Sequence, residues 1–495
     1  MSPATSRGTK SRPFRKPSTA MRSLRPSSKS MSIKSWTRPA PRSPPAQKKD
    51  LPPPFLLAQN AEIHQLIAQF QASAVDVQQL EILLRVAIFK PANQLVQHLL
   101  QARADQIDAQ YQSRRGRHYK GRETLQVQGL FGGFALERDY YYEPEKKRGH
   151  YPADAALGLE AGNTPALARL MCLESIDEQS FEKAEKHLKE TGGIAVPARQ
   201  LQRLVQQIGP GAQQWQERQT PPEPCDAPIL YVSGDGTGVR LRQEELAGRK
   251  GKQEDGSAKT RQANLGCVFT QHKRDEQGRP IRDHESTSYI STLGTVEELG
   301  LLLRWEARRR GSGTAGKIIL LIDGALGLEH HGLINFPGCL QIVDFYHAVQ
   351  HLKELLEALR GKEHPEFKKL HSQWIKLLLK DGVEKIIEQA RTQSQGQSTA
   401  ATVTKALNYF EHNIPRMQYG TFRKAGYFIG SGVVEAGCKA VIGARCKQSG
   451  MFWSEAGAEN ILALRCIERS RQWDHFWKSR ASDHAARNDA LALAA

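Results

Sequence analysis

The sequence predicts an α/β fold, in which a mixed five-stranded sheet with helices is interrupted by an all-helical insertion. Apolar runs predict strands at 228–233, 264–271, 286–291, 317–322 and 340–343, and a helical pattern covers 295–310. Polar residues that include Gly278 separate the second and third strands, as expected of a hairpin. The stretch between Asp323 and Glu435 is too long for one loop and has helical periodicity almost throughout.

Three strands, a helix and two further strands form the order of an RNase H-like core. Alternating strands and helices alone would indicate only an α/β fold. The positions of three acids make the prediction more specific. Asp235 ends the first apolar run and Asp323 ends the fourth. Glu435 follows Gly430-Ser-Gly432, a turn whose serine can cap a helix.

Three converging carboxylates predict a catalytic metal site. Mg²⁺ and Mn²⁺ prefer oxygen ligands. With two such ions, one polarises an attacking water or 3′-hydroxyl and the other stabilises the leaving oxygen. Each acid also has an ordinary structural explanation, because Asp-Gly is common in turns and a glutamate at a helix start favours the macrodipole. In this order and context, we expect Asp235, Asp323 and Glu435 to be the metal ligands.

The composition favours a polyanionic partner. The chain has 495 residues and a formal net charge of +18, and DNA or RNA is the commonest partner of such a protein. A basic protein with a solvated Lys/Arg surface is the alternative. The seven cysteines form no C-x-x-C pair, so neither a zinc ribbon nor a thioredoxin-type site is indicated. No apolar stretch is long enough to span a membrane, so we expect a soluble protein.

The chain divides into eight predicted parts, with a Pro-rich linker before the core. These parts are a disordered basic tail (1–53), a helical segment (54–118), a β-hairpin region joined through Gly132-Gly133 (119–160), a helix-turn-helix-like region (161–212), the first part of the core (227–347), the all-helical insertion (348–412), the last part of the core (413–480) and a C-terminal tail (481–495). The linker covers 213–226.

The first fifty residues are rich in Ser, Pro, Arg and Lys, and Asp50 is their only acid. Such a segment cannot bury a core. Three interpretations remain open: a DNA-binding tail, a translation start placed too early, and a transit peptide. The many prolines argue against the amphipathic helix of a transit peptide.

Three helices fit the region from Thr164 to Ile208, with a break before Pro197. Pro197 suits the first turn of the third helix. That helix would place Arg199, Gln202 and Arg203 on one exposed face, as in a helix-turn-helix that reads DNA. A simple helical bundle is the alternative.

Four helices are expected in the insertion. Their predicted ranges are Ala348–Gly361, Glu366–Lys380, Val383–Thr392 and Thr402–His412, with a break at Gln393–Ser398. The final acid would then return to the core in space rather than in sequence.

Two further groups of residues lie beside the predicted acids. Asp344 leaves the fifth strand and His347 lies one helical turn later. We expect both beside the metals or the scissile strand, and a helix cap is the alternative for Asp344. His347 and His351 are spaced for zinc, but no third ligand is evident nearby.

After Glu435, four residues suit contacts with DNA ends or unpaired bases. They are Lys439, Arg445, Lys447 and Trp453. A solvated helix face is the alternative for each.

The stretches YVSGDGTGV, FPGCLQIVDFYHAVQHL, FIGSGVVEAGCKAVIGARCKQSGMFW and NILALRC resemble the ISKra-type bacterial insertion-sequence transposases. These are RNase H-like DDE transposases, distantly similar to the Mutator superfamily. The resemblance spans roughly residues 120 to 480. It implies that Asp235, Asp323 and Glu435 form the catalytic triad, with Asp344 and His347 as an auxiliary element.

The resemblance implies an enzyme that binds the terminal inverted repeats of its element, cleaves the ends with Mg²⁺ or Mn²⁺, and transfers the 3′ ends to target DNA. It also implies a homo-oligomer in the transposition complex and a bacterial cytoplasmic location, nucleoid-associated when DNA is bound. Two alternatives remain: a nuclease on the same fold without strand transfer, and an inactive or repurposed DNA-binding copy.

Overall fold

The computed structural model describes residues 61–111, 116–218, 227–251, 253, 256, 258–324, 326–394 and 400–481. The predictions for the tail 1–53, and for all but the first residue of 481–495, lie outside these residues. Within them, no helix has the length and apolar character needed to cross a membrane.

Two helices and a small sheet begin the described chain. Helices α1 (Ala61–Gln71) and α2 (Val77–Gln110) pack together, and Asp76 caps α2 by accepting a bond from the Gln79 backbone N–H. The sheet contains β1 (His118–Gly129), β2 (Gly132–Glu143) and β3 (Arg148–His150), and α3 (Pro152–Ala156) follows. The hairpin turn was predicted at Gly132-Gly133. It lies at Leu130-Phe131, because Gly129 pairs with Gly132 and leaves a two-residue loop.

Three helices follow, as the sequence predicts: α4 (Pro165–Asp177), α5 (Phe181–Gly192) and α6 (Ala198–Arg218). The linker prediction for 213–226 is wrong at its start, because α6 continues through Pro210 to Arg218. Its apolar face extends past the proline, with Ala212 and Trp215 both buried. Burial of that face outweighs the local cost of a proline in a helix.

The central sheet is mixed and five-stranded, which confirms the predicted α/β class. Its strands are β4 (Ile229–Val239), β5 (Arg261–Gln271), β8 (Ser288–Thr292), β9 (Ile318–Ile322) and β10 (Leu340–Val343). The spatial order is β10-β9-β4-β5-β8. Strand β5 is antiparallel to β4 and β8, whereas β9 is parallel to β4 and β10.

Short elements and two helices connect these strands. Between β4 and β5 lies the 3₁₀ turn η1 (Gln243–Leu246), and β6 (Lys273–Arg274), β7 (Pro280–Ile281) and η2 (His284–Ser286) separate β5 from β8. Helix α7 (Val296–Arg309) precedes β9 and starts with a capping box between Thr295 and Glu298. Helix α8 (Leu326–Asn335) joins β9 to β10.

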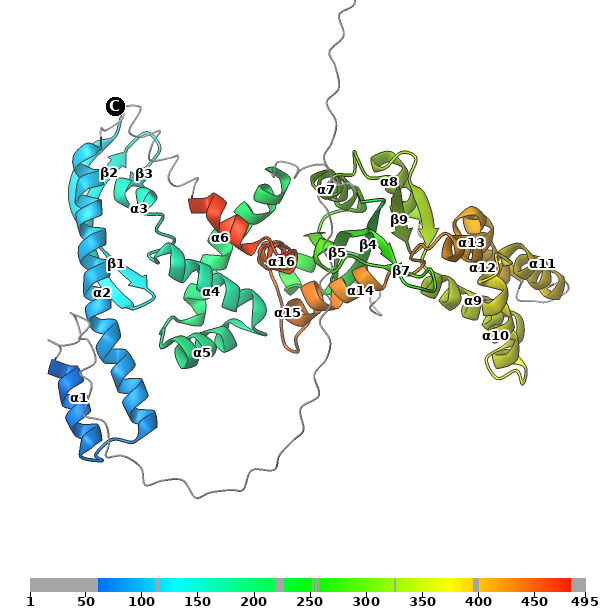
Figure 1. Cartoon of the computed structure of the whole chain (residues 1–495). Helices are drawn as coiled ribbons and strands as arrows, with labels where there is room; N and C mark the ends of the chain where they lie inside the picture. The colour runs from blue at the N-terminus through cyan, green and yellow to red at the C-terminus, as the bar shows by residue number, and fades with distance from the viewer. Residues whose placement is uncertain are drawn as a thin grey trace, which may run out of the picture. The chain divides into compact units, whose positions relative to one another are not determined.

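Helices cover both faces of the sheet (Figure 1). On β5, a Cβ at Gly266 would lie 2.6 Å from Leu303 of α7, so that face packs against α7. Leu265 is the next residue along the strand and points to the opposite face. There it lies 2.9 Å from the position of a Cβ on Gly437. Asp235 is the register partner of Leu265 and therefore shares this second face.

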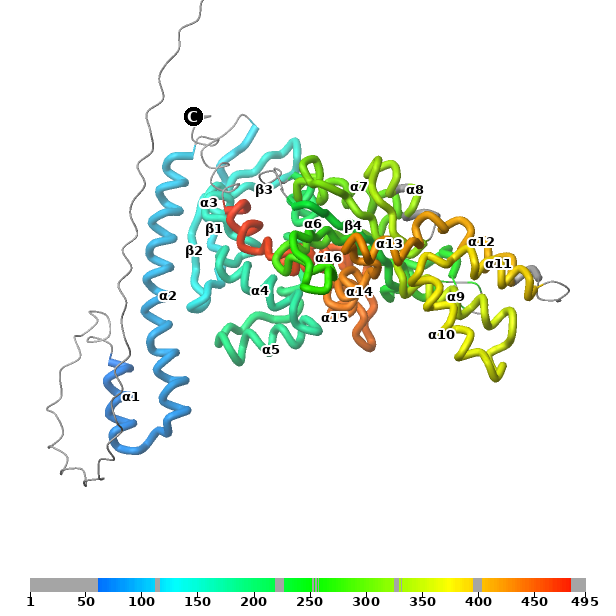
Figure 2. The backbone as a smooth tube through the Cα atoms, turned by 45° about the vertical axis from the view of Figure 1, so that its right-hand side comes forward, coloured from blue at the N-terminus to red at the C-terminus, as the bar shows by residue number. Residues whose placement is uncertain are grey.

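The insertion is a group of four helices with bounds close to the predicted ones. They are α9 (Phe345–Arg360), α10 (Phe367–Leu378), α11 (Val383–Ser394) and α12 (Ala400–Asn413). Each packs against at least two of the others, and Figure 2 shows them side by side. Trp374 of α10 is fully buried in this group and donates a hydrogen bond to the Gln389 side chain on α11.

The chain after the insertion returns to the sheet through short helical pieces. They are η3 (Ile414–Arg416), α13 (Tyr419–Lys424), α14 (Gly432–Gly437), the π-helical segment η4 (Cys438–Gly443) and α15 (Ala444–Cys446). Helix α16 (Glu455–Arg469) then packs on β8 and α6, and a helical stretch covers 473–481. One continuous apolar core links the three-helix region, the sheet and the insertion.

Helices α6 and α16 approach closely at Gly209, which yields a stability prediction. A Cβ at this position would lie 2.4 Å from Asn460 Cβ and 2.8 Å from its Cα. We expect Gly209→Ala to lower the free energy of unfolding by about 1–3 kcal/mol through overpacking. The control is Gly211→Ala on the same helix, where the nearest atom is the Arg480 guanidinium at 3.4 Å. Urea denaturation of both variants measures the difference, and equal stabilities would contradict the close approach.

Candidate active site

Asp235 lies within the first strand of the central sheet. The sequence placed it at the end of the strand, which is wrong, because β4 continues to Val239 and pairs with β5 along its whole length. The Asp235 side chain is half-buried, and one carboxylate oxygen accepts a bond of 2.7 Å from the Gly236 backbone N–H. The acid therefore stands on the sheet face that α14 covers.

Asp323 directly follows β9, the strand next to the one that carries Asp235. Ser233 of β4 is the register partner of Leu321 of β9, and its hydroxyl donates to the Leu321 carbonyl over 3.0 Å. Asp235 and Asp323 each follow these partners by two residues. Because paired strands run about 4.8 Å apart, the two acids lie near each other where β9 ends.

Asp344 is a buried hydrogen-bond hub rather than an open ligand. It follows β10, its side chain is fully buried, and its backbone N–H donates to the Ile322 carbonyl at 2.6 Å. One carboxylate oxygen accepts the His347 backbone N–H at 2.7 Å, which caps α9. The other accepts the Ser431 backbone N–H. Burial raises the pKa of Asp344, but the bonds from His347 and Ser431 outweigh it and hold the pKa below its usual value.

Glu435 is brought back to the sheet by the contacts of the segment before α14. The Phe345 backbone N–H donates to the Ile429 carbonyl at 2.9 Å, so the chain leaves and re-enters the core at one place. Ser431 was expected to cap the helix with its side chain. It makes no such cap, and its hydroxyl instead donates to Glu435 Oε1 at 3.0 Å.

The segment after Glu435 contacts the strand of Asp235 directly. A Cβ at Gly437 would lie 2.5 Å from the Tyr289 ring, so only a glycine allows α14 to approach the sheet this closely. One residue later, the Cys438 thiol lies close enough to Asp235 for that carboxylate to act on it. Burial and the Asp235 charge together raise the pKa of this thiol. The helix that carries Glu435 therefore packs against the strand of Asp235, and Cys438 is a neighbour of this acid that the sequence did not reveal.

His347 faces the acids from the first turn of α9. Its Nδ1 lies 3.1 Å from Asp344 Oδ1, and this bond raises the pKa of the imidazole. Burial opposes the rise, whereas the charges of Asp344, Asp323 and Asp235 add to it. Potential ligand atoms of Asp344, His347 and Glu435 all lie within 4.8 Å of one another.

Asp235 and Asp323 lie outside that compact group among the described residues. A site for two ions distributes its ligands over both, so its carboxylates need not all be this close. His351 is also outside the group. Its Nδ1 lies 3.0 Å from Glu354, and its ring is 4.0 Å from that of Tyr409. Tyr409 of α12 donates its hydroxyl to the Asp323 carbonyl at 3.0 Å, which ties the insertion to the acidic site.

Five of the seven predicted DNA-contacting residues are open to solvent. Arg199 and Arg203 are exposed on α6, and Gln202 is half-buried beside them. Lys439 is exposed on η4. Lys447 is also exposed, and its ammonium donates to the Thr237 hydroxyl at 2.7 Å, two residues beyond Asp235.

Arg445 does not lie on an open helix face as predicted, because its side chain is fully buried. Its guanidinium donates to the Ser175 carbonyl at 2.9 Å and the Gln179 carbonyl at 3.2 Å. It also lies between the rings of Phe181 and Trp453, at 4.7 and 5.0 Å from their centroids. Burial lowers the pKa of Arg445 to about 10. The residue joins α15 to the three-helix region.

Trp453 is buried as well, which corrects its assignment as a stacking platform for unpaired bases. Its backbone N–H donates to the Arg240 carbonyl at 3.1 Å, and its carbonyl accepts from Arg242 at 2.8 Å. The neighbouring Phe452 is 58% exposed. The sequence offered no means of telling which of these adjacent aromatic residues points outward.

Comparisons with known proteins place part of this chain near one family. A family model described as "Uncharacterised protein family (UPF0236)" matches residues 77–255, which include Asp235 but end before Asp323. The "UPF0236 protein in vanSb 3'region" of Streptococcus gallolyticus is 24% identical over 379 residues, 72% of this chain and 75% of that protein.

Among solved structures, the "Drosophila P element transposase strand transfer complex" matches 64% of this chain and 80% of its own chain. The identity is 11% and the TM-score is 0.24. A similarity at this level does not establish a common fold.

The hub role of Asp344 predicts a large loss of stability on its removal. Asp344→Ala leaves the backbone N–H groups of His347 and Ser431 without their acceptor, at a cost of about 2–4 kcal/mol. Tyr346→Ala is the matched control, since this side chain is 68% exposed on the same helical turn. Urea unfolding of both variants gives the comparison. A loss below about 1 kcal/mol for Asp344→Ala would show that the hub is dispensable.

Proposed function

We propose that this chain is a DNA transposase with an RNase H-like catalytic core and a DDE-type site. The observation that carries the proposal is that Glu435 lies in one group with His347, and that the charges of Asp235 and Asp323 both act on the same histidine. Asp235 stands on β4, and Asp323 directly follows the adjacent β9. The third acid returns after a helical insertion, on a helix that packs against the strand of Asp235.

The topology supports this proposal. Three antiparallel strands precede a helix, and two strands parallel to the first follow it. This is the order of elements that an RNase H-like core requires. Asp235 stands on the central strand of the sheet, and Asp323 follows the adjacent one. The helical insertion lies between β10 and the helix that bears the third acid.

The residues fit two hard divalent cations. The three acids supply carboxylate oxygens, which Mg²⁺ and Mn²⁺ prefer, and each acid is half-buried with access to solvent. Concentrated negative charge at the site acts on His347, whose pKa Asp323 and Asp235 both help to raise. When bound, such ions activate the attacking oxygen and stabilise the leaving one.

The protein's own residues position the ligands and the DNA. Hydrogen bonds from the Ser431 hydroxyl and the Gly236 backbone N–H orient the carboxylates of Glu435 and Asp235. His347 places a donor beside the acids, where a scissile phosphate would lie. Fixed orientation lowers the entropic cost of bringing the reacting groups together.

The remaining features suit a partner of DNA. A net charge of +18 attracts the phosphate backbone, and α6 presents Arg199 and Arg203 on its exposed face. We propose that these residues contact the terminal inverted repeats of the element. Strand transfer would take place in a homo-oligomer bound to both ends, in the bacterial cytoplasm at the nucleoid.

Removal of any one carboxylate charge is expected to abolish the chemistry. Asp235→Asn, Asp323→Asn and Glu435→Gln keep side-chain shape but remove a metal-ligand charge. Each variant should lose more than about nine-tenths of cleavage and strand transfer while it still binds DNA. Glu363→Gln, an exposed acid in the loop between α9 and α10, is the control.

The assay uses DNA carrying the inverted repeats found beside the gene, with Mg²⁺ or Mn²⁺. A variant with near-normal cleavage would remove its residue from the triad. Cleavage of ends without transfer of pre-cut 3′ ends would identify a nuclease rather than a transposase.

The exposed arginines of α6 are expected to contribute to repeat recognition. Arg199→Ala and Arg203→Ala should each reduce discrimination between repeat and random DNA by about 1–3 kcal/mol. Lys189→Ala on α5 removes the same charge from another exposed position and is the control. Fluorescence anisotropy with both DNAs measures the ratio of affinities. An equal loss on all sequences would place these arginines on phosphates rather than on bases.

A further inference from the structure

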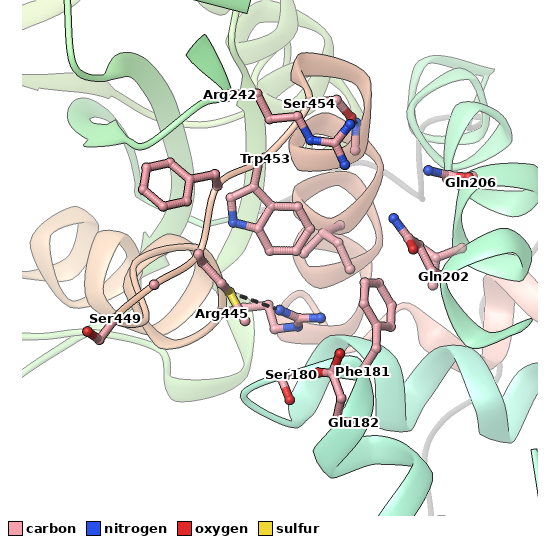
Figure 3. A pocket seen from close by; sticks show the side chains of 16 residues that line it. Ser180, Phe181, Glu182, Gln202, Gln206, Arg242, Arg445, Ser449, Trp453 and Ser454 are labelled. Carbon is pink, nitrogen blue, oxygen red and sulfur yellow. Dashed lines mark hydrogen bonds between the residues drawn. The ribbon is translucent and has the colours of Figure 1, made fainter. Parts of the chain in front are cut away.

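A cleft beside the three-helix region combines aromatic, cationic and amide groups, and no residue of the acidic site lines it. Its volume is about 400 Å³, within the range of small-ligand sites. Figure 3 shows Phe181 and Trp453 on either side of the Arg445 guanidinium, with Gln202 and Gln206 across from them. These residues come from α5, α6, α15 and the loop before α16.

The walls of the cleft contain hydrogen-bonding groups that the described part of the protein does not use. Arg445 is fully buried, and its Nη2 has no partner within the described part of the chain. The side-chain amides of Gln202 and Gln206 likewise form no hydrogen bond to another described group. Buried donors are almost always paired, so a partnerless guanidinium nitrogen beside a cleft indicates a missing acceptor.

The rim of the cleft adds an aromatic ring and positive charge. Phe452 is 58% exposed and lines both this cleft and a second hollow next to it. That second hollow is lined by Arg242, Lys250 and Lys259, all exposed. A strand of nucleic acid carries two groups that would complement these features side by side, a flat base for the aromatic ring and an anionic phosphate for the positive charge.

We propose that this cleft binds an unpaired nucleobase of DNA, with Phe452 as its stacking residue. The inference rests on the proposed DNA function and adds a base-binding site to it. The base would stack at Phe452, its edge would meet the Gln202 and Gln206 amides, and Arg445 Nη2 would donate to a base acceptor. The adjacent phosphates would lie along Arg242, Lys250 and Lys259.

The cleft is connected to the acidic site through β4. Lys447 bonds to Thr237, and Trp453 pairs with the backbone at Arg240 and Arg242. The loop from Lys447 to Trp453 therefore runs alongside the segment from Thr237 to Arg242, which follows Asp235 in the chain. A base held in the cleft would fix the end of a strand relative to the acids.

Abasic substitution provides the test, because it removes the base and leaves the phosphate charge unchanged. The probes are a labelled duplex with a short thymine overhang, the same duplex with abasic residues in the overhang, and a blunt duplex. The protein is the full chain with Asp235→Asn, so that nothing is cut. We expect thymine overhangs to bind about five- to 150-fold tighter than abasic ones.

Phe452→Ala should remove that preference and leave affinity for the blunt duplex unchanged, and Phe452→Trp should restore it. Phe131→Ala, an exposed aromatic at the β1–β2 turn, is the control. A preference that survives Phe452→Ala, or equal binding of thymine and abasic overhangs, would overturn the proposal.

These outcomes separate the cleft from the proposed catalytic function. Loss of the base preference alone would leave Asp235-dependent cleavage intact. A base preference without any cleavage by the unmodified chain would support the cleft and contradict the transposase.

Discussion

The buried carboxylate of Asp344 is the interaction on which the rest of the site depends. Its backbone is bonded to Ile322, the residue before Asp323, and its side chain holds His347 on one side of the insertion and Ser431 on the other. Ser431 in turn holds Glu435. A long helical excursion therefore begins and ends at one fully buried side chain. Without such a fixed point, the position of the third acid would depend on the packing of four insertion helices.

Much of the fold could be predicted from the sequence because its central strands are continuous apolar runs. Buried strands such as Ile318–Ile322 have little alternative to the interior of a sheet. The insertion helices could also be predicted from the sequence, since each has an apolar stripe at helical spacing. The end of α6 could not be predicted, because a proline in the sequence does not show whether the buried face of the helix continues beyond it.

The candidate acidic site could also be predicted in part, because two of its acids are placed by strands of the sheet. Asp235 lies within β4 and Asp323 directly follows the neighbouring β9, so the geometry of the sheet brings them near each other. Arg445 and Trp453 were misplaced because charge and aromatic character do not reveal burial. Arg445 is buried by carbonyl groups of Ser175 and Gln179 and by the Phe181 ring, which lie far away in the sequence. No sequence pattern singled out Phe452 or Cys438. The structure identifies Phe452 by its exposure and Cys438 by its position near Asp235.

The central claim is that Asp235, Asp323 and Glu435 share one divalent-metal site. Iron-directed cleavage tests it most directly, because Fe²⁺ bound in place of Mg²⁺ generates radicals that cut the polypeptide near its ligands. We expect cuts near all three acids in the folded full chain, suppressed by excess Mg²⁺ and absent in Asp323→Asn. Cuts confined to the neighbourhood of His347 and Glu435, with none near Asp235 or Asp323, would show a separate single-ion site and contradict the account.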